Sequence, residues 1–224
     1  MNIFSITSQS PYYTAVETLL VATFPESERR SMPLQRQFAD SNEQFKVYAA
    51  LEGEKFVGFF TLWTLGEFRF VEHLAIVPEC RNCGYGTRLV QQIKELSPLP
   101  LLLEIERGAT AEQLARKDFY ERSGFVALDT PYQQPPYEAG GEALEMHLMM
   151  WDAEAGKCHN FSPKIIEKMI EIIYSEVYGI KWGFRKVVIR FKSVVYKTII
   201  VLRKTKPLVV KIISNLRKII SNVI

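Results

Sequence analysis

Cysteine is scarce in this sequence, and none of its apolar runs is long. The 224 residues include three cysteines, which argues against a disulfide scaffold and suits the reducing cytoplasm. Charged residues interrupt every apolar stretch before it reaches the ~18 residues that a membrane-spanning helix needs. The opening segment MNIFSITSQS has neither a basic flank nor an apolar core, so we expect no signal peptide and a cytoplasmic location.

Ligands for a metal ion are also few. Cys80 and Cys83 have the spacing of a zinc or redox pair, but no second pair of cysteine or histidine residues lies near them. A site built on these two residues would need ligands from elsewhere. We therefore expect no metal site and interpret both cysteines as incidental.

Charged residues divide the chain into two parts of opposite sign. Residues 1–155 contain 13 Lys and Arg against 22 Asp and Glu, a net charge of −9, whereas residues 156–224 contain 15 against 3, a net charge of +12. This asymmetry predicts an acidic domain over 1–155 and a basic extension over 156–224. Apolar residues recur at helical spacing in the extension, so we expect it to be helical.

Two interpretations of the basic extension stay open. It can lie on an anionic membrane surface, where each Lys or Arg contributes about 1 kcal/mol, or it can pack on the acidic domain. Nucleic acid is a weaker alternative, because the extension has few aromatic residues to stack on bases. The sequence does not indicate an oligomeric state.

Turn residues and hydrophobic periodicity predict a mixed α/β domain. The predicted order is β-α-α-β-β-β-α-β-α-β-β, with a loop rich in Pro and Tyr between the last two strands, at 131–141. A helix capped by Ser162 opens the extension. The other expected elements are strands at 2–8, 45–52, 55–65, 67–78, 99–106, 125–130 and 142–152, and helices at 11–24, 26–41, 84–96 and 110–124.

The segment RNCGYG, Arg81 to Gly86, lies between a predicted strand and a predicted helix. Free N–H groups and the dipole at a helix N-terminus attract anions, and glycine lets an anion approach without a Cβ in the way. An arginine just upstream adds charge-assisted hydrogen bonds. The segment therefore predicts a cradle for a phosphate or pyrophosphate, although it is neither a Walker loop nor the dinucleotide fingerprint.

The spacing Arg-x-x-Gly-x-Gly, after HLAIVPE and before TRLVQQI, resembles the acetyl-CoA pyrophosphate loop of the GNAT family, the Gcn5-related N-acetyltransferases. FYERSGF, Phe119 to Phe125, resembles the second motif of that family, in which a helix carrying a tyrosine closes with Gly-Phe. The predicted element order also matches the family fold. The resemblance covers about residues 1–152, and its C-terminal portion looks like that of small bacterial members.

This resemblance implies an enzyme that transfers an acetyl group from acetyl-CoA to a primary amine by direct attack within a ternary complex. In the family, the strand before the loop separates from the next strand and pairs with the pantetheine arm of the cofactor. The backbone N–H of Ile76 or Val77 is then expected to polarise the thioester carbonyl. The residues implied in cofactor binding are Leu74, Ile76, Val77, Arg81, Cys83, Gly84, Tyr85, Gly86 and Thr87.

Three side chains are implied in catalysis. Tyr120 occupies the family's tyrosine position and is expected to protonate the departing thiolate. Glu72 is the first choice for the base that deprotonates the amine, and Glu104 is the second. His73 has a suitable pKa, but strand alternation places it on the face opposite Glu72. Gln113 stands where many members carry an asparagine that contacts the cofactor, which puts that contact in doubt.

Structural alternatives accompany these assignments. The loop glycines are also compatible with a plain strand-to-helix turn that binds nothing. Tyr120 could serve only in packing, and Glu72 could be an ordinary surface carboxylate. The tyrosines of 131–141 either wall the acceptor site or belong to a rigid connector. The acidic domain favours a cationic acceptor, either a small amine or a protein amine. The alternative function is a non-catalytic CoA-binding or regulatory module, held at an anionic surface by the extension.

Overall fold

The computed structural model describes residues 1–138, 140–153 and 161–180, of which those up to Gly179 belong to one compact unit, Met1–Gly179. The segments of the basic extension beyond residue 180 lie outside the described residues. Among the residues that are described, no helix is both long and apolar enough to cross a membrane.

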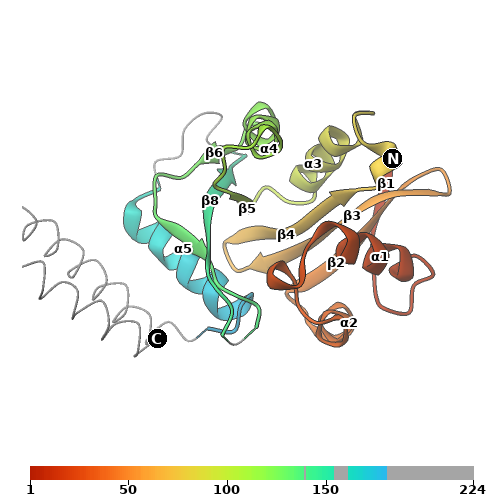
Figure 1. The fold of residues 1–224 in the computed structure, drawn as a ribbon, viewed down its shortest axis with the longest axis horizontal. Helices are drawn as coiled ribbons and strands as arrows, with labels where there is room; N and C mark the ends of the chain where they lie inside the picture. The colour runs from red at the N-terminus through yellow and green to blue at the C-terminus, as the bar shows by residue number, and fades with distance from the viewer. Residues whose placement is uncertain (139, 154–160, 181–224) are drawn as a thin grey trace, which may run out of the picture. The chain divides into compact units, whose positions relative to one another are not determined.

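The domain is a mixed α/β structure, as expected (Figure 1). Two short 3-10 turns, at Glu26–Glu28 and Pro78–Cys80, interrupt the sequence of helices and strands. The strands are β1 (Asn2–Ile6), β2 (Phe45–Glu52), β3 (Lys55–Leu65), β4 (Phe68–Ile76), β5 (Leu101–Glu106), β6 (Val126–Ala127), β7 (Tyr132–Gln134) and β8 (Leu144–Trp151). The helices are α1 (Tyr13–Thr23), α2 (Met32–Ser41), α3 (Tyr85–Glu95), α4 (Ala111–Arg122) and α5 (Pro163–Glu176).

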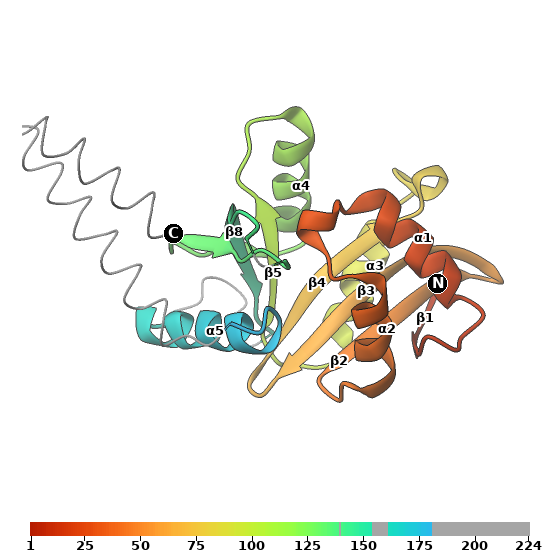
Figure 2. The ribbon, with the colours of Figure 1, turned by 60° about the horizontal axis from the view of Figure 1, so that its bottom comes forward.

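Within the described residues, all eight strands join one sheet in the order β1-β2-β3-β4-β5-β8-β6, with β7 also paired to β8. Every pairing is antiparallel except that of β4 with β5, which is parallel. Figure 2 shows α4 and α5 on opposite sides of the strands β5 and β8. The sheet therefore has helices on both faces near the point where β4 meets β5.

The helix boundaries follow local capping chemistry. Thr110 caps α4 in a capping box with Gln113, and Gly124 ends it with φ +82°. The Gly53 turn between β2 and β3 also forms as predicted, with φ +62°. In contrast, α1 begins later than expected: Tyr12 rather than Ser10 is its N-cap residue.

Two differences from the predicted order lie near the C-terminal end of the sheet. The strand expected at 125–130 is reduced to the two residues of β6, and the loop expected at 131–141 contains β7. The tyrosine-rich segment pairs with β8 and so lies within the sheet rather than outside it. Pairing with a neighbouring strand thus outweighs the Pro- and Gly-rich composition on which the loop prediction depended.

The expected domain boundary near residue 155 also moves. Helix α5, which was assigned to the basic extension, belongs to the same compact unit as the sheet. Ser162 is its N-cap residue and Pro163 opens it, as predicted. The residues Met169, Ile170, Ile173 and Tyr174 bury one face of the helix, which explains why it belongs to the domain.

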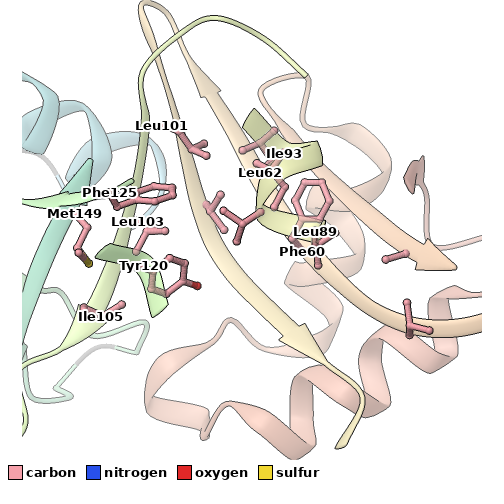
Figure 3. Close-up of a cluster of buried hydrophobic side chains, with 14 of the residues drawn as sticks. Phe60, Leu62, Leu89, Ile93, Leu101, Leu103, Ile105, Tyr120, Phe125 and Met149 are labelled. Carbon is pink, nitrogen blue, oxygen red and sulfur yellow. The ribbon is translucent and has the colours of Figure 1, made fainter. Parts of the chain in front are cut away.

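One cluster of buried side chains lies between the sheet and the helices α3 and α4 (Figure 3). Leu89, Val90 and Ile93 of α3 contribute to it, and their spacing is that of one helical face. Leu103 and Ile105 of β5 enter the same cluster, together with Tyr120 of α4. The predicted apolar face of α3 is therefore the face that packs on the sheet.

Candidate active site

The sheet opens between β4 and β5. Their parallel pairing covers only Arg69 with Leu101, Phe70 with Leu102, and Val71 with Leu103. Beyond Val71 both strands continue, but β4 keeps only β3 as a partner and β5 keeps only β8. We call this divergence of β4 and β5 the split. It leaves one edge of each strand free to hydrogen-bond another molecule.

A β-bulge sets which backbone groups of β4 face the split. Thr61 pairs with His73 and Leu62 with Val71, so Glu72 has no partner on β3. Past the bulge, the N–H of Val77 donates to the carbonyl of Val57 at 3.0 Å. Because backbone groups alternate along a strand, the amides of Leu74 and Ile76 then face the split.

This alternation corrects one expectation. The N–H of Val77 bonds β3 and is therefore not the group that polarises a thioester in the split. The carbonyl of Ile76 itself accepts a hydrogen bond from Nε of Arg81 at 3.2 Å, on the side of β4 away from β3. Of the two backbone N–H groups that were expected to polarise the thioester, the N–H of Ile76 is the one that faces the split.

The loop before α3 has the backbone shape expected of an anion cradle. Gly84 is the N-cap residue of α3 with φ +79°, and its carbonyl accepts the N–H of Arg88 at 3.1 Å. The N–H groups of Gly84 to Thr87 therefore precede the first intrahelical donor and have no partner within the helix. An L-residue at Gly84 would be strained, which explains the first glycine of the motif.

A cleft of about 750 Å³ connects this loop to the split. Its walls come from the end of α1, from β4, from the loop and from α4. Seven of the predicted site residues line it, namely Leu74, Ile76, Arg81, Gly84, Gly86, Thr87 and Tyr120. Val77 lines an adjacent cavity instead, and Cys83 and Tyr85 line neither.

Tyr120 lies at the base of this cleft, on α4. Its ring packs edge-on against that of Phe125, with centroids 5.6 Å apart (Figure 3). It packs in the same way against Phe119, with centroids 5.0 Å apart. The side chain is 8% exposed, and burial raises the pKa of Tyr120 to about 12. The phenol is consequently protonated at neutral pH and able to donate a hydrogen bond.

Gln113 has a structural role on the same helix. Its amide oxygen accepts the backbone N–H of Thr110 at 3.3 Å, and its own N–H bonds the Thr110 hydroxyl at 3.2 Å. The residue that replaces the family's asparagine thus caps α4, and it is not among the residues that line the cleft.

Glu72 lies in a buried ion pair with Arg30. One carboxylate oxygen is 2.6 Å from a guanidinium nitrogen, and the two side chains are 1% and 3% exposed. Trp63 and Tyr137 donate further hydrogen bonds to this carboxylate at 2.9 and 2.6 Å. Burial alone would raise the pKa of Glu72, but the charge of Arg30 and these donors outweigh it, so the pKa lies below its ordinary value.

The bulge also moves His73. The Nδ1 atom of His73 is 4.0 Å from a Glu72 oxygen, so the two side chains lie on the same side of the sheet and the predicted alternation is wrong here. The other ring nitrogen is 2.9 Å from the carbonyl of Glu28. Burial lowers the pKa of His73, so the neutral ring is favoured.

Glu104 has a different set of partners. Leu103 and Ile105 enter the cluster that holds Tyr120, so Glu104 between them faces the opposite side of the sheet. It accepts hydrogen bonds from the hydroxyls of Tyr132 and Tyr178. Burial raises the pKa of Glu104 to about 7, against the effect of these donors.

Sequence reasoning missed most of the residues around the two carboxylates. Arg30 is 42 positions from Glu72, and nothing in its local sequence marks it as a partner. Tyr178 lies in the segment that was assigned to the extension. The tyrosines of 131–141 had been noted, and the structure places Tyr132 on Glu104 and Tyr137 on Glu72.

Comparison with known proteins agrees with this geometry. The sequence profile described as the acetyltransferase (GNAT) family matches residues 13–125. A putative GNAT-family acetyltransferase from Bacteroides thetaiotaomicron shares 33% identity, covering 81% of this chain and 100% of its own, with a TM-score of 0.75. The chain belongs to the GNAT family. It is therefore an acetyltransferase with acetyl-CoA as donor.

Two further proteins that are similar to this chain carry more specific names. The ribosomal protein bS18-alanine N-acetyltransferase of Haemophilus influenzae is 26% identical over 106 residues, which are 46% of this chain and 69% of that enzyme. An aminoglycoside 6'-N-acetyltransferase solved with coenzyme A is 19% identical, with a TM-score of 0.51 over 68% of this chain and 97% of its own. The second likeness shows the fold alone.

Proposed function

We propose that this protein transfers an acetyl group from acetyl-CoA to a primary amine by direct attack in a ternary complex. The observation that carries the proposal is the split, which joins the two faces of the sheet. Tyr120 lies on one side of β5 and Glu104 on the other. A donor held in the cleft and an amine that approaches from the Glu104 side would therefore meet where β4 and β5 part.

The residues of the cleft fit the donor. Free amides at the start of α3 suit a pyrophosphate, and Arg81 adds a positive charge beside them. The free edge of β4 at Leu74 and Ile76 suits an amide-bearing arm that pairs like an added strand. Acetyl-CoA supplies an activated acyl group on a thiol that can leave.

We assign the base to Glu104 rather than to Glu72. A general base works best when its pKa lies near the operating pH, and the pKa of Glu104 is raised to about 7. Both oxygens of Glu72 are bound to donors that favour the charged form, so it is a poor acceptor for a further proton. The structural role of Glu72 is to hold Arg30 and Tyr137 beside the split.

Tyr120 is the proposed acid. Its pKa of about 12 keeps the phenol protonated, so it can donate a hydrogen bond to the sulfur as negative charge develops there. Glu104 takes a proton from the bound ammonium, and the neutral amine then attacks the acyl carbon. As the C–N bond forms and the C–S bond breaks, Tyr120 gives its proton to the departing thiolate, and the second proton that the amine nitrogen loses restores the phenol. The N–H of Ile76 faces the split, where it can polarise the acyl carbonyl.

The test measures thiol release from acetyl-CoA with a panel of amines, and identifies each product by mass. The panel contains a polyamine, an amino sugar, free lysine, and a peptide with an N-terminal alanine, the last suggested by the bS18-alanine relative. Calorimetry with CoA is run in parallel. Binding without turnover of any amine would favour a non-catalytic CoA-binding module, and no CoA uptake would refute both.

A further inference from the structure

The hydroxyl of Tyr178 contacts the carboxylate of Glu104 from a distant part of the chain. Its oxygen is 3.1 Å from one Glu104 oxygen and 3.0 Å from the other, although the two residues are 74 positions apart. Tyr178 follows the last turn of α5, so the helix that ends the compact unit delivers this contact.

The direction of the hydrogen bond follows from a third residue. Gln134 of β7 donates an amide N–H to the Tyr178 oxygen at 3.2 Å. A phenol carries one proton, and an amide N–H can only be donated. With Gln134 bonded to a lone pair of the oxygen, the Tyr178 proton is directed to Glu104.

The backbone around Tyr178 is held in place by separate contacts. The carbonyl of Val177 accepts a hydrogen bond from the buried Arg30 guanidinium at 3.0 Å. One turn earlier, the Tyr174 hydroxyl donates to the carbonyl of Gln133 at 2.6 Å. The ring of Tyr178 also packs on that of Tyr137, with centroids 5.1 Å apart. Its hydroxyl is therefore aimed by fixed structure rather than by a mobile loop.

We propose that Tyr178 is a positioning residue for Glu104, and that its hydroxyl orients the carboxylate and stabilises its charged form. Helix α5 is then part of the acetyltransferase site rather than an appendage. Tyr178 lies outside residues 13–125, which the family profile matches. The inference rests on the proposed role of Glu104 as base.

The groups that face Glu104 set the expected direction of the change. Tyr132, Tyr178 and Gln134 donate side-chain hydrogen bonds that favour its charged form, and the charge of Glu72 opposes its ionisation. Arg30 offsets the charge of Glu72. Removing the Tyr178 hydroxyl takes away one donor to the charged form and leaves burial unchanged, so the pKa of Glu104 should rise.

The experiment is a carbon-detected NMR titration of glutamate carboxyl groups in the full chain. The Glu104 signal is identified by its loss in Glu104→Gln. In Tyr178→Phe the midpoint of that signal is expected to rise by about one pH unit. The matched control is Tyr174→Phe, which removes a hydroxyl from the same helix that bonds Gln133 instead of Glu104, and it should leave the midpoint unchanged.

Gln134→Met provides a second variant, because it removes a donor both to the Tyr178 oxygen and to Glu104 itself, and it should also raise the midpoint. An unchanged midpoint in either Tyr178→Phe or Gln134→Met would overturn the proposal, and so would an equal shift in Tyr174→Phe. The titration needs no acceptor amine. If Glu104→Gln stays active while Tyr178→Phe shifts the midpoint, Glu104 is not the base, but the effect of Tyr178 on the ionisation of Glu104 is confirmed.

Discussion

Glu72 and Glu104 lie on neighbouring strands at the same split, and both carboxylates are buried, yet their surroundings differ. Glu72 is bound to a guanidinium, an indole N–H and a phenol. The neutral phenols of Tyr132 and Tyr178 are the main donors to Glu104. The positive charge of Arg30 offsets the cost of burying the Glu72 carboxylate, and the pKa of Glu72 is lowered. Neutral donors offset the cost of burying the Glu104 carboxylate only in part, so the pKa of Glu104 is raised.

This contrast shows that strand position does not decide which carboxylate acts as the base. Two carboxylates whose environments separate their pKa values are suited to different tasks. Glu72 is suited to holding structure, and Glu104 is suited to exchanging a proton near neutral pH. The predictions below test this division.

Glu104→Gln should have the largest effect on activity. The amide keeps the shape of the side chain but cannot accept the proton of the amine, so kcat/KM should fall by about 10²- to 10⁴-fold. CoA affinity, measured by calorimetry, should not change, because Glu104 faces away from the cleft. A Glu104→Gln enzyme with normal kcat/KM would show that the base lies elsewhere.

Arg30→Met should have the largest effect on stability. It leaves the Glu72 charge buried without its cation, which costs about 3–5 kcal/mol in the free energy of unfolding. The matched control is Arg36→Met, since Arg36 pairs with Glu17 at the surface, where solvent screens ion pairs and they contribute little to stability. Urea denaturation of both variants gives the comparison, and equal losses would contradict a special role for Arg30.

Tyr120→Phe should lower kcat by about 10- to 100-fold, the value of one hydrogen bond to a developing charge. The ring keeps its contacts with Phe119 and Phe125, so CoA affinity and the fold should be unaffected. Steady-state kinetics and calorimetry on the same preparation separate the two quantities. Unchanged kcat would assign the acid to another group or to water.

The pH dependence of the unmodified enzyme should show the smallest effect. A base must be deprotonated to act, and the pKa of Glu104 lies at about 7, so kcat/KM should fall as the pH drops below that value. At pH 6 it should be about tenfold lower than at its plateau. A profile that is flat between pH 5 and 7 would point to a base whose pKa is not raised, such as Glu72, whose pKa is lowered by the charge of Arg30.

Local sequence marked the residues that we propose for the donor and left most of the residues around the two carboxylates unmarked. The cradle at Arg81 to Gly86 and the tyrosine of α4 are marked by short motifs, because glycine at the start of a helix and a fixed spacing leave a pattern in neighbouring residues. The surroundings of Glu104 come from β7 and from the end of α5. Contacts between distant segments leave no such local pattern.

The motifs, together with chain order and periodicity, predicted the mixed α/β fold, a glycine loop at the start of α3, the place of Tyr120 on α4 and the helix that became α5. Tertiary structure decided that the bulge at Glu72 turns His73 to the same side, and that Arg30 neutralises Glu72. It also decided that Tyr178 reaches Glu104. A motif reflects interactions between residues that are close in the sequence. The ionisation of a buried carboxylate depends instead on every charge and hydrogen-bond donor that folding brings within a few ångströms of it.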